Sequence, residues 1–315
     1  ITGRTYRICA GCSDGESTAD VNAMALQRGD AVLFKAGETF HIGREADRLK
    51  LKSGVLYGRY GNGANPIITG SGILFATRFR GVLDLERGGN NVTIDGIDVH
   101  GGADENFNIF MRDVTTASIS NLTITNGNGG GIGFERGADV VVDKVVLSGL
   151  PGRPHESLTF DGTNGYVVSN VRSTGGGHAA INNKGNARNG EIFGSEFSST
   201  NNDPTFYIER AENIHVHDNW IHTNSGSSTK KALFSIGIEK FGDPAKHYVR
   251  NIEINNNVIE NAERTGLKFF LKETIADDPS RAERLYDNIH IHHNAIVGTG
   301  QEGLSWSSAI RVSDN

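Results

Sequence analysis

A short phrase of alternating apolar and polar residues recurs along this chain of 315 residues. Each copy contains apolar residues separated by small polar ones, then a turn rich in Asp, Asn and Ser, then further apolar residues. The central apolar residues of successive copies lie 25, 23, 26, 24, 24, 38 and 37 residues apart. A nearly constant period with two insertions predicts a solenoid, in which each copy forms one coil and stacks on the next. The central residues are Ile94, Ile119, Val142, Val168, Ile192, Val216, Ile254 and Ile291.

The residues inside each coil predict strands rather than helices. Apolar and polar residues alternate over short segments, which is typical of half-buried strands, and no coil contains a long apolar pattern of helical period. Asn, Asp and Gly occur where the chain must bend, and these residues tolerate left-handed backbone angles. We therefore predict an all-β fold, a right-handed parallel β-helix, rather than a leucine-rich repeat. One continuous domain is expected, with an amino-terminal cap and the first coils in residues 1–70 and the remaining coils in residues 71–315.

The amino-terminal segment departs from the repeat. Residues 17–26 (STADVNAMAL) begin with a helix-capping Ser and place apolar residues at helical spacing, so a short helix is expected there. Such a helix would cover the open apolar end of a solenoid. Cys9 and Cys12 are the two cysteines, and a single CxxC pair cannot supply four zinc ligands. They are expected to form a small disulfide loop or to remain as two thiols.

Charge and hydropathy argue against two classes of partner. The net charge of −6 argues against nucleic acid, because phosphate binding needs a clearly basic face. No apolar run approaches the roughly 18 residues of a membrane-spanning helix. The chain begins at Ile1 without a signal peptide, so we expect either the mature form of a secreted or periplasmic protein or a chain that never had a signal. We expect a monomer without a metal site or cofactor; calcium remains an alternative, although no ligand set for it is recognised.

Stacked coils turn one sequence position per coil into a column along the solenoid. When the strands that precede each phrase are aligned, one outward-facing column carries charges of both signs. A second outward column, two positions earlier, contains small and aromatic residues and is expected to form the floor of a groove for a linear polymer. The charged column comprises Glu86, Arg112, Glu135, Asp161, Lys184, Glu209, Glu239 and Lys272, followed directly by Arg87, Arg136, Arg210 and Lys240. The second column comprises Phe110, Gly133, Thr159, Asn182, Tyr207, Gly237 and Phe270.

The middle coils of this groove form the strongest candidate site. Alternating charges on neighbouring coils can pair and simply keep a sheet face soluble, and this explanation suffices for the outer members of the column. It is weaker for the middle coils, where several cations converge. Asn183 falls at an inward position, so the Asn-Asn-Lys segment is expected to contain a local irregularity that redirects its lysine. The converging residues are Lys184, Tyr207, Arg210, Lys240, Asn182 and His178.

Two of these coils carry motifs that resemble those of an enzyme family. The segments INNKG and YIERAEN resemble motifs of secreted bacterial β-helix polysaccharide lyases that cleave alginate and chondroitin-type chains, and VNAMALQRGDAVLFKAGETF resembles the amino-terminal cap of related proteins. The resemblance implies β-elimination of a uronate-containing polysaccharide such as alginate. It implies that Lys184 removes the C5 proton and Arg210 assists, or that Tyr207 acts together with Lys184 or Lys240. Substrate-binding roles then fall to Asp161, His178, Asn182, Glu209, Glu239, Lys268, Lys272 and Arg136.

Other functions remain open. A β-helix glycoside hydrolase would use paired carboxylates, with Asp161 and Glu209 two coils and about 9.6 Å apart, and Glu209 and Glu239 one coil apart. A non-catalytic carbohydrate-binding or tail-spike-like solenoid would present exposed aromatic residues, which are few here. A C5-epimerase shares the first step of a lyase, and the Pro-His-Glu segment at 154–156 resembles an epimerase motif, although its loop position favours coincidence. Histidines 215, 217, 222, 290, 292 and 293 are expected to be surface or stacked turn residues.

Overall fold

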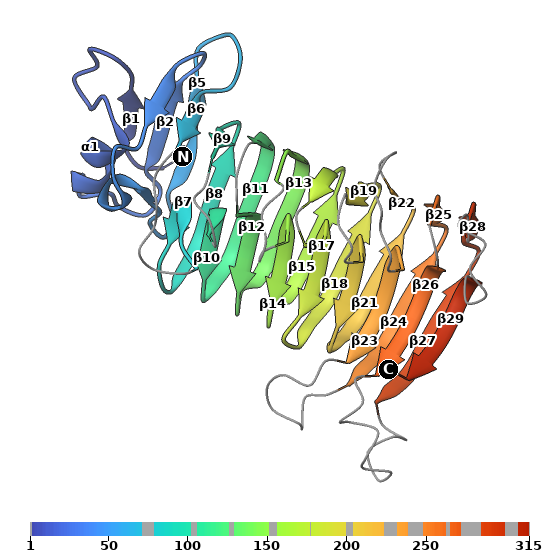
Figure 1. The fold of residues 1–315 in the computed structure, drawn as a ribbon. Coiled ribbons are helices and arrows are strands. Elements are labelled where there is room, and N and C mark those ends of the chain that lie inside the picture. The colour runs from blue at the N-terminus through green and yellow to red at the C-terminus, as the bar shows by residue number, and fades with distance from the viewer. Residues whose placement is uncertain are drawn as a thin grey trace.

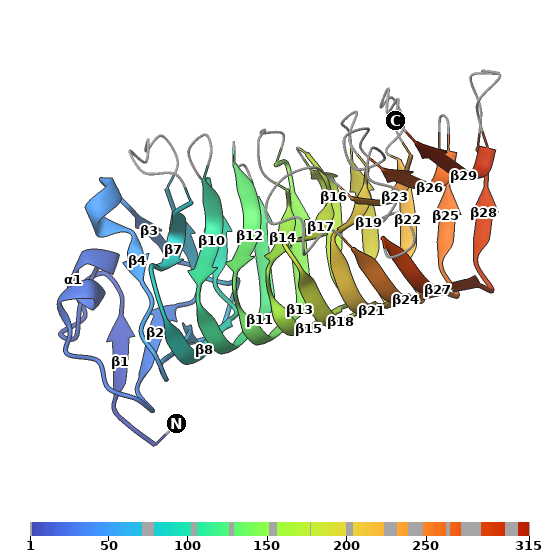
Figure 2. The ribbon, with the colours of Figure 1, turned by 90° about the horizontal axis from the view of Figure 1, so that it is seen from below.

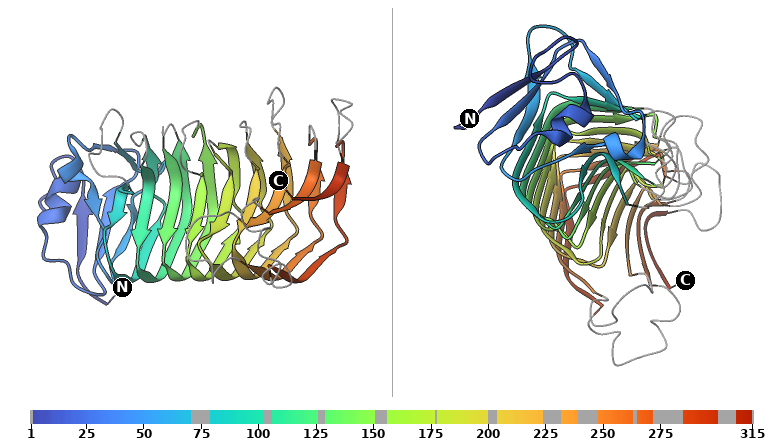
Figure 3. Two further views of the ribbon diagram at one scale, coloured as in Figure 1. Left: turned by 60° about the horizontal axis from the view of Figure 1, so that its bottom comes forward. Right: turned by 90° about the vertical axis from the view of Figure 1, so that its left-hand side faces the viewer.

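The chain forms a single β-solenoid of about eight turns with almost no helix (Figure 1). The computed structural model describes residues 2–70, 79–101, 106–125, 129–150, 156–176, 178–199, 204–223, 232–238, 248–262, 265–271, 285–299 and 308–314. The coils stack along one axis (Figure 2), and the view along that axis shows successive strands superposed around a common interior (Figure 3). The predicted all-β solenoid is therefore confirmed.

Two parallel sheets form the faces of the solenoid. A nineteen-stranded sheet includes two strands, or one long strand, from most coils, and a ten-stranded sheet carries the candidate site. The nineteen-stranded sheet contains β1 (Thr5–Ile8), β2 (Ala31–Lys35), β3 (Thr39–His41), β5 (Leu56–Tyr60), β6 (Ile67–Thr69), β8 (Gly89–Asp95), β9 (Asp98–His100), β11 (Val114–Thr125), β13 (Ala138–Ser148), β15 (Asn164–Ser169), β16 (Arg172–Gly176), β18 (Ala187–Phe193), β19 (Glu196–Ser199), β21 (Ala211–His217), β22 (Trp220–Thr223), β24 (Val249–Asn255), β25 (Val258–Glu260), β27 (Tyr286–His292) and β28 (Ala295–Val297). The ten-stranded sheet contains β4 (Leu49–Lys50), β7 (Gly81–Leu85), β10 (Phe107–Arg112), β12 (Gly130–Glu135), β14 (Leu158–Asp161), β17 (Ile181–Lys184), β20 (Phe206–Glu209), β23 (Phe234–Ile238), β26 (Thr265–Leu271) and β29 (Ser308–Asp314).

The strand registers place the predicted central residues of the repeat in one interior column. Each pairs with the next across parallel neighbours, including over the two longer intervals. The first seven, from Ile94 to Ile254, are fully buried, and Ile291 in the last coil is partly buried. Burial of one such side chain in every coil contributes about 1.5–3 kcal/mol per residue. The 24-residue period therefore corresponds to a continuous apolar core.

Two residues beyond each central residue the backbone bends through a left-handed conformation. The eight bend residues have φ between 52° and 68°. Six of them are Asn, Asp or Gly, as the turn composition predicts, because these residues adopt positive φ at little cost. Lys144 and His293 are the exceptions. The other bend residues are Gly96, Asn121, Asn170, Gly194, Asp218 and Asn256.

Two buried asparagines, Asn219 and Asn257, and the partly buried Asn294 follow three late bends and bond to one another along the axis. Asn257, between β24 and β25, is 1% exposed. Its side-chain oxygen accepts hydrogen bonds from the backbone and side-chain nitrogens of Asn219, both at 3.0 Å. Its amide nitrogen donates to the backbone oxygens of Val216 and Asn255, each at 2.9 Å, and to Asn294 Oδ1 at 3.0 Å. The asparagine thus satisfies polar groups of three coils.

Replacing Asn257 by Ala is expected to lower the free energy of unfolding by about 2–3 kcal/mol, because several buried polar groups lose their partner. Urea denaturation followed by circular dichroism measures the loss. Asn90→Ala, at an exposed position on β8, is the control and should change stability by less than about 0.5 kcal/mol. Equal losses in the two variants would contradict a special contribution of the buried ladder.

The amino-terminal segment contains the predicted helix. α1 (Thr18–Ala23) begins at Ser17, which forms a capping box with Asp20, and its Val21 is buried in the core. A 3₁₀ turn, η1 (Glu45–Asp47), precedes β4, and α1 packs against both elements. Cys9 and Cys12 form a disulfide, one of the two expected states. Within the described residues, no helix has the length and apolar character needed to span a membrane.

Candidate functional site

The ten-stranded sheet brings the middle of the charged column together as predicted. Arg112 pairs in register with Glu135, Glu135 with Asp161, and Asp161 with Lys184. Glu209 comes next, on β20, whose register with β17 continues the series. Neighbouring strands lie about 4.8 Å apart, so each of these side chains can interact with the next. We call these five residues the charged row.

Beyond Glu209 the predicted alignment is wrong by two residues. Glu209 pairs with Gly237 rather than with Glu239. The rings of Phe206 and Phe234 stack with their centroids 4.5 Å apart, which favours the observed register. The sequence permits this error, because SIGI places an apolar residue at the inward position in both alignments: Ile236 in the observed one and Ile238 in the predicted one.

The corrected register also changes the second outward column. Tyr207 on β20 pairs with Ser235 on β23, and Ser235 in turn pairs with Lys268 on β26. The ammonium of Lys268 lies 5.2 Å from the ring centroid of Phe270. Three predicted site residues, Glu239, Lys240 and Lys272, lie outside the described residues.

The Asn-Asn-Lys segment pairs regularly, so the predicted irregularity is wrong. β14 and β17 pair without a register shift. Asn183 is fully buried; it accepts a hydrogen bond from the Tyr166 hydroxyl at 2.7 Å and donates one to the backbone oxygen of Tyr207 at 3.2 Å. Because these partners satisfy the inward amide, Lys184 follows the ordinary alternation of the strand.

The second outward column is a packed layer rather than the open floor that we expected. Phe110, Thr159, Asn182 and Tyr207 are each at most 3% exposed. At Gly133 an added β-carbon would meet the ring of Phe107 at 2.7 Å, so this aromatic ring covers the glycine. A ligand can therefore reach the charged row except Glu209, which is 6% exposed, but not most of this column in the observed conformation.

A buried carboxylate that the sequence analysis set aside organises this layer. Glu156, just before β14, is 2% exposed and accepts hydrogen bonds from Thr159 Oγ1 and Asn182 Nδ2, each at 2.9 Å. Lys184 Nζ lies 3.3 and 3.4 Å from its two oxygens, and His178 Nδ1 lies 3.4 Å from Oε1. Three predicted site residues thus converge on Glu156. Its only signal in the sequence is the Pro-His-Glu segment.

Lys184 is held as a cation. Burial opposes its charge, but Glu156, Asp161 and Glu209 outweigh burial and raise the pKa of Lys184. Burial likewise opposes ionisation of Glu156, but Lys184 and His178 hold the pKa of Glu156 far below its ordinary value. A lysine acts as a base near neutral pH only when its pKa is lowered. The pKa shift of Lys184 has the opposite direction from the one that the predicted base role requires.

The surroundings of Asp161 favour its uncharged form, whereas those of Lys184 and Glu156 favour their charged forms. Burial is the largest cause that raises the pKa of Asp161; Lys184 and Arg210 oppose it, whereas Glu135 and Glu156 raise the pKa further. No side chain of the described residues donates a hydrogen bond to this carboxyl group. The Asp161 carboxyl therefore retains its proton to a higher pH than an exposed aspartate does.

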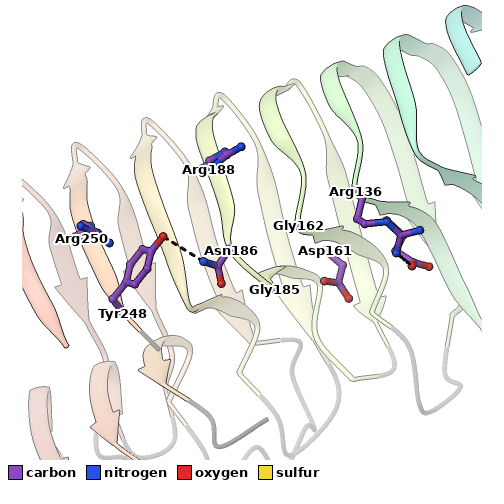
Figure 4. Close-up of a pocket in the computed structure, with 9 residues that line it drawn as sticks. Arg136, Asp161, Gly162, Gly185, Asn186, Arg188, Tyr248 and Arg250 are labelled. Carbon is purple, nitrogen blue, oxygen red and sulfur yellow. Dashed lines mark hydrogen bonds and ion pairs between the residues drawn. The ribbon is translucent and has the colours of Figure 1, made fainter. Parts of the chain in front are cut away.

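A cleft of about 760 Å³ opens beside Asp161, where the ten-stranded sheet bends into the next face (Figure 4). The Tyr248 hydroxyl accepts a hydrogen bond from Asn186 Nδ2 at 3.2 Å and donates one to Glu212 Oε2 at 3.4 Å. The guanidinium of Arg250 lies 3.7 Å from the centre of the Tyr248 ring. The cleft is lined by Glu135, Arg136, Asp161, Gly162, Gly185, Asn186, Arg188, Tyr248 and Arg250.

Arginines give this cleft a cationic wall. Arg136 pairs with Asp113 at 2.7 Å and also contacts Glu135, and Arg250 lies 3.6 Å from Glu212. Arg188 is exposed and forms no ion pair with a described residue. Its guanidinium is available to an anionic group of a ligand in the cleft.

A smaller hollow lies on the other side of the charged row. Phe79, Phe107 and Phe110 line it, with ring centroids 5.2 Å apart for Phe107 and Phe110 and 6.3 Å apart for Phe79 and Phe110. Phe79 is 42% exposed. Glu135 and Asp161 line both this aromatic hollow and the cationic cleft. The two carboxyl groups therefore lie at the junction of the two cavities.

Arg136 and Arg210, which the sequence analysis selected as site residues, both form ion pairs with nearby carboxylates. Arg136 and Arg210 occupy left-handed bends, with φ of 54° and 52°, at the ends of their strands. Arg210 pairs with the adjacent Glu209 at 2.8 Å. Their roles toward a substrate remain predictions, and so do those of Tyr207 and Lys268.

Gly185 leaves the space that the Asp161 carboxyl occupies. Its φ is +62°, and a β-carbon at this position would collide with Asp161 Oδ1. Gly185→Ala is expected to displace that carboxyl and to abolish any activity that depends on it, with a backbone cost of about 1–2 kcal/mol. Gly175→Ala is the matched control, because its φ is +73° and nothing lies within 4 Å of the new β-carbon. Urea unfolding and activity assays on both variants separate strain from displacement: equal activities would contradict the positioning role.

The chain belongs to the right-handed β-helix family. The family model described as a right-handed β-helix region matches residues 107–277. A comparison with curated protein sequences finds no match.

Solved structures with different activities share the fold. PfbA, a surface adhesin of Streptococcus pneumoniae, superposes with a TM-score of 0.60 at 12% identity, over 94% of this chain and 75% of that chain. A rhamnogalacturonan lyase superposes with a TM-score of 0.51 at 12% identity, over 93% and 87% of the two chains. An alginate lyase from Paenibacillus sp. str. FPU-7 gives 0.51 at 10% identity, over 93% and 99%. At these identities the similarity shows the fold alone.

Proposed function

We propose that the protein cleaves an acidic polysaccharide by glycoside hydrolysis, with the scissile bond across Glu135 and Asp161. The position of these two carboxyl groups at the junction of the aromatic hollow and the cationic cleft supports this proposal. A sugar chain that lies in the cleft and extends over the exposed ring of Phe79 passes over them.

The two carboxyl groups differ in the way that glycoside hydrolysis needs. The raised pKa of Asp161 suits a general acid that protonates the leaving oxygen. Glu135, which is held by Arg112 at 2.8 Å and by Arg136, suits the carboxylate that attacks the anomeric carbon. Glu135 and Asp161 are register neighbours on strands about 4.8 Å apart, near the 5–5.5 Å separation of retaining enzymes. Asp161 would then act as base toward the water that releases the glycosyl-enzyme.

The two cavities differ in the sugars that they suit. The exposed ring of Phe79 offers an apolar platform against which a pyranose face can pack. On the cleft side, Arg188 and Arg250 can bind a uronate carboxylate through charge-assisted hydrogen bonds. The substrate class is therefore an anionic chain, in keeping with the partner expected from the sequence.

β-Elimination by a polysaccharide lyase is the second candidate, and the presence of Tyr248 in the same cleft as three arginines favours it. A lyase needs cations that stabilise the enolate and a group that moves the C5 proton. Arg188 and the protonated Lys184 could supply positive charge, and a tyrosine could transfer the proton. In this scheme Lys184 neutralises the uronate and is not the base.

An extracellular or periplasmic location follows from a polymeric substrate. The Cys9–Cys12 disulfide supports an oxidising compartment. We expect the protein to act there as a monomer.

Incubation with polymannuronate, polyguluronate, glucuronan and polygalacturonate tests both candidates. Reducing ends are measured together with ultraviolet absorbance of the unsaturated uronyl end, which only β-elimination produces. Reducing ends without absorbance support the hydrolase, whereas absorbance that rises with them supports the lyase and overturns the hydrolase. Binding without either product would place the protein among non-catalytic carbohydrate-binding solenoids.

A further inference from the structure

A histidine-rich cluster lies on the nineteen-stranded sheet, outside the charged row and the cleft. Glu191 on β18 pairs in register with His215 on β21, and His217 lies two residues further along β21 on the same face. One ligand atom from each of Glu191, His215 and His217 lies within 4.8 Å of the others. Three potential ligands from two adjacent strands thus point into one small volume.

The His217 ring is held in an orientation suited to a ligand. Its Nδ1 lies 2.7 Å from Asp218 Oδ2, and its Nε2 lies 3.2 Å from Glu191 Oε1. Phe193 stacks on the ring at 5.2 Å with an interplanar angle of 6°. A carboxylate that accepts the proton of one ring nitrogen fixes the tautomer, so the other nitrogen carries the lone pair that a metal needs. Asp218 stands in this relation to His217.

His215 completes the set. Its ring lies against that of His217, with centroids 4.2 Å apart, and its Nε2 contacts Asn255 Oδ1 at 3.1 Å. The rings are half-buried and Glu191 is exposed, so an ion can enter from solvent. The expected stacking of these histidines is observed, and the Glu191 carboxylate lies within reach of both rings.

We propose that Glu191, His215 and His217 form a surface site for a divalent transition-metal ion, with Zn²⁺ as the representative ion. Two imidazoles and one carboxylate are a donor set that zinc and its neighbours in the first transition row bind, with water in the remaining positions. The site takes the metal without changing the charged row. On binding, the Glu191 carboxylate turns from its contact with His217 Nε2 to the ion.

Isothermal titration of the chelator-treated protein with ZnCl₂ tests the proposal. We expect one saturable site whose affinity falls at least tenfold in His217→Ala and in His215→Ala. Asp218→Asn should weaken binding about 10–100-fold, because it removes the group that orients His217. Visible absorption spectra with Co²⁺ should show the d–d bands of one bound ion in the unmodified protein and the loss of these bands in the same variants.

His222→Ala is the matched control. His222 Nε2 lies 3.2 Å from Glu196 Oε1, so it belongs to a similar histidine–glutamate pair on neighbouring strands, but no third ligand joins it among the described residues. This variant should bind Zn²⁺ as the unmodified protein does. Undiminished binding in the His215 and His217 variants, or equal losses in His222→Ala, would overturn the proposal. So would binding that depends instead on Glu253 and His292, which lie 3.3 Å apart.

Discussion

Replacing Asp161 by Asn is expected to lower kcat on the responsive polysaccharide by about 10²–10⁴-fold, which is the usual contribution of a positioned general acid. The amide keeps the shape of the side chain but cannot donate the proton to the leaving oxygen. KM should change little, because the arginines and Phe79 that we propose as sugar-binding residues remain in place. Steady-state kinetics with reducing-end detection measures both parameters.

The pH profile distinguishes an acid from a merely structural carboxyl. Because the pKa of Asp161 is raised, its protonated form persists upward in pH, and kcat of the unmodified protein should fall on the alkaline side as this proton is lost. Asp161→Asn should lack that alkaline limb. Glu260→Gln, on β25 and away from the cleft, serves as the control and should retain full activity. Activity of Asp161→Asn within threefold of the unmodified protein would exclude Asp161 as the acid.

Replacing Lys184 by Met is expected to destabilise the protein by about 3 kcal/mol, because it leaves the buried Glu156 carboxylate without its cation. The Lys184 side chain is 25% exposed and that of Glu156 is 2% exposed, so solvent screens the pair weakly. Urea unfolding measures the loss. The double variant Glu156→Gln with Lys184→Met should recover part of it, since no buried charge is then left unpaired. A double variant as unstable as the sum of the two single variants would contradict this account.

The same pair predicts how stability depends on pH. The pKa of Glu156 is lowered, so its contribution is present above the unfolded-state value of 4.5 and is lost as pH falls. The pKa of Lys184 is raised, so its contribution is present below 10.5 and is lost as pH rises beyond that value. The stability difference between the unmodified protein and Lys184→Met should therefore be constant near neutral pH and should shrink in acid.

The sequence predicts those parts of the fold that repeat. The interior column from Ile94 to Ile291 and the left-handed bends that follow it recur with the period, so one correct coil predicts the others. The predicted strand register was wrong where the repeat pattern is less distinct. At β23 the small and apolar residues of SIGI fit two alignments, and ring stacking between Phe206 and Phe234 decides between them.

The candidate site was predictable only in part, because it combines residues that no single period relates. Asp161 and Lys184 were found through their column. Glu156 lies before its strand, and its importance depends on burial, which the sequence does not show. Tyr248 lies 62 residues from its partner Asn186, so the cleft exists only once the coils are stacked.

A row of exposed asparagines with left-handed backbone angles, near the starts of β18, β21, β24 and β27, shows where this molecule can change in length. Asn189, Asn213, Asn251 and Asn288 donate side-chain hydrogen bonds of 2.7–2.9 Å from coil to coil. The bonded residues are 24 positions apart for Asn213 and Asn189 but 38 and 37 apart in the next two steps. Extra sequence is thus inserted between rungs of the ladder and leaves the spacing of the rungs unchanged. A lineage, or a protein engineer, could therefore change the additional residues between Asn213 and Asn251, and between Asn251 and Asn288, while the scaffold beneath stays constant.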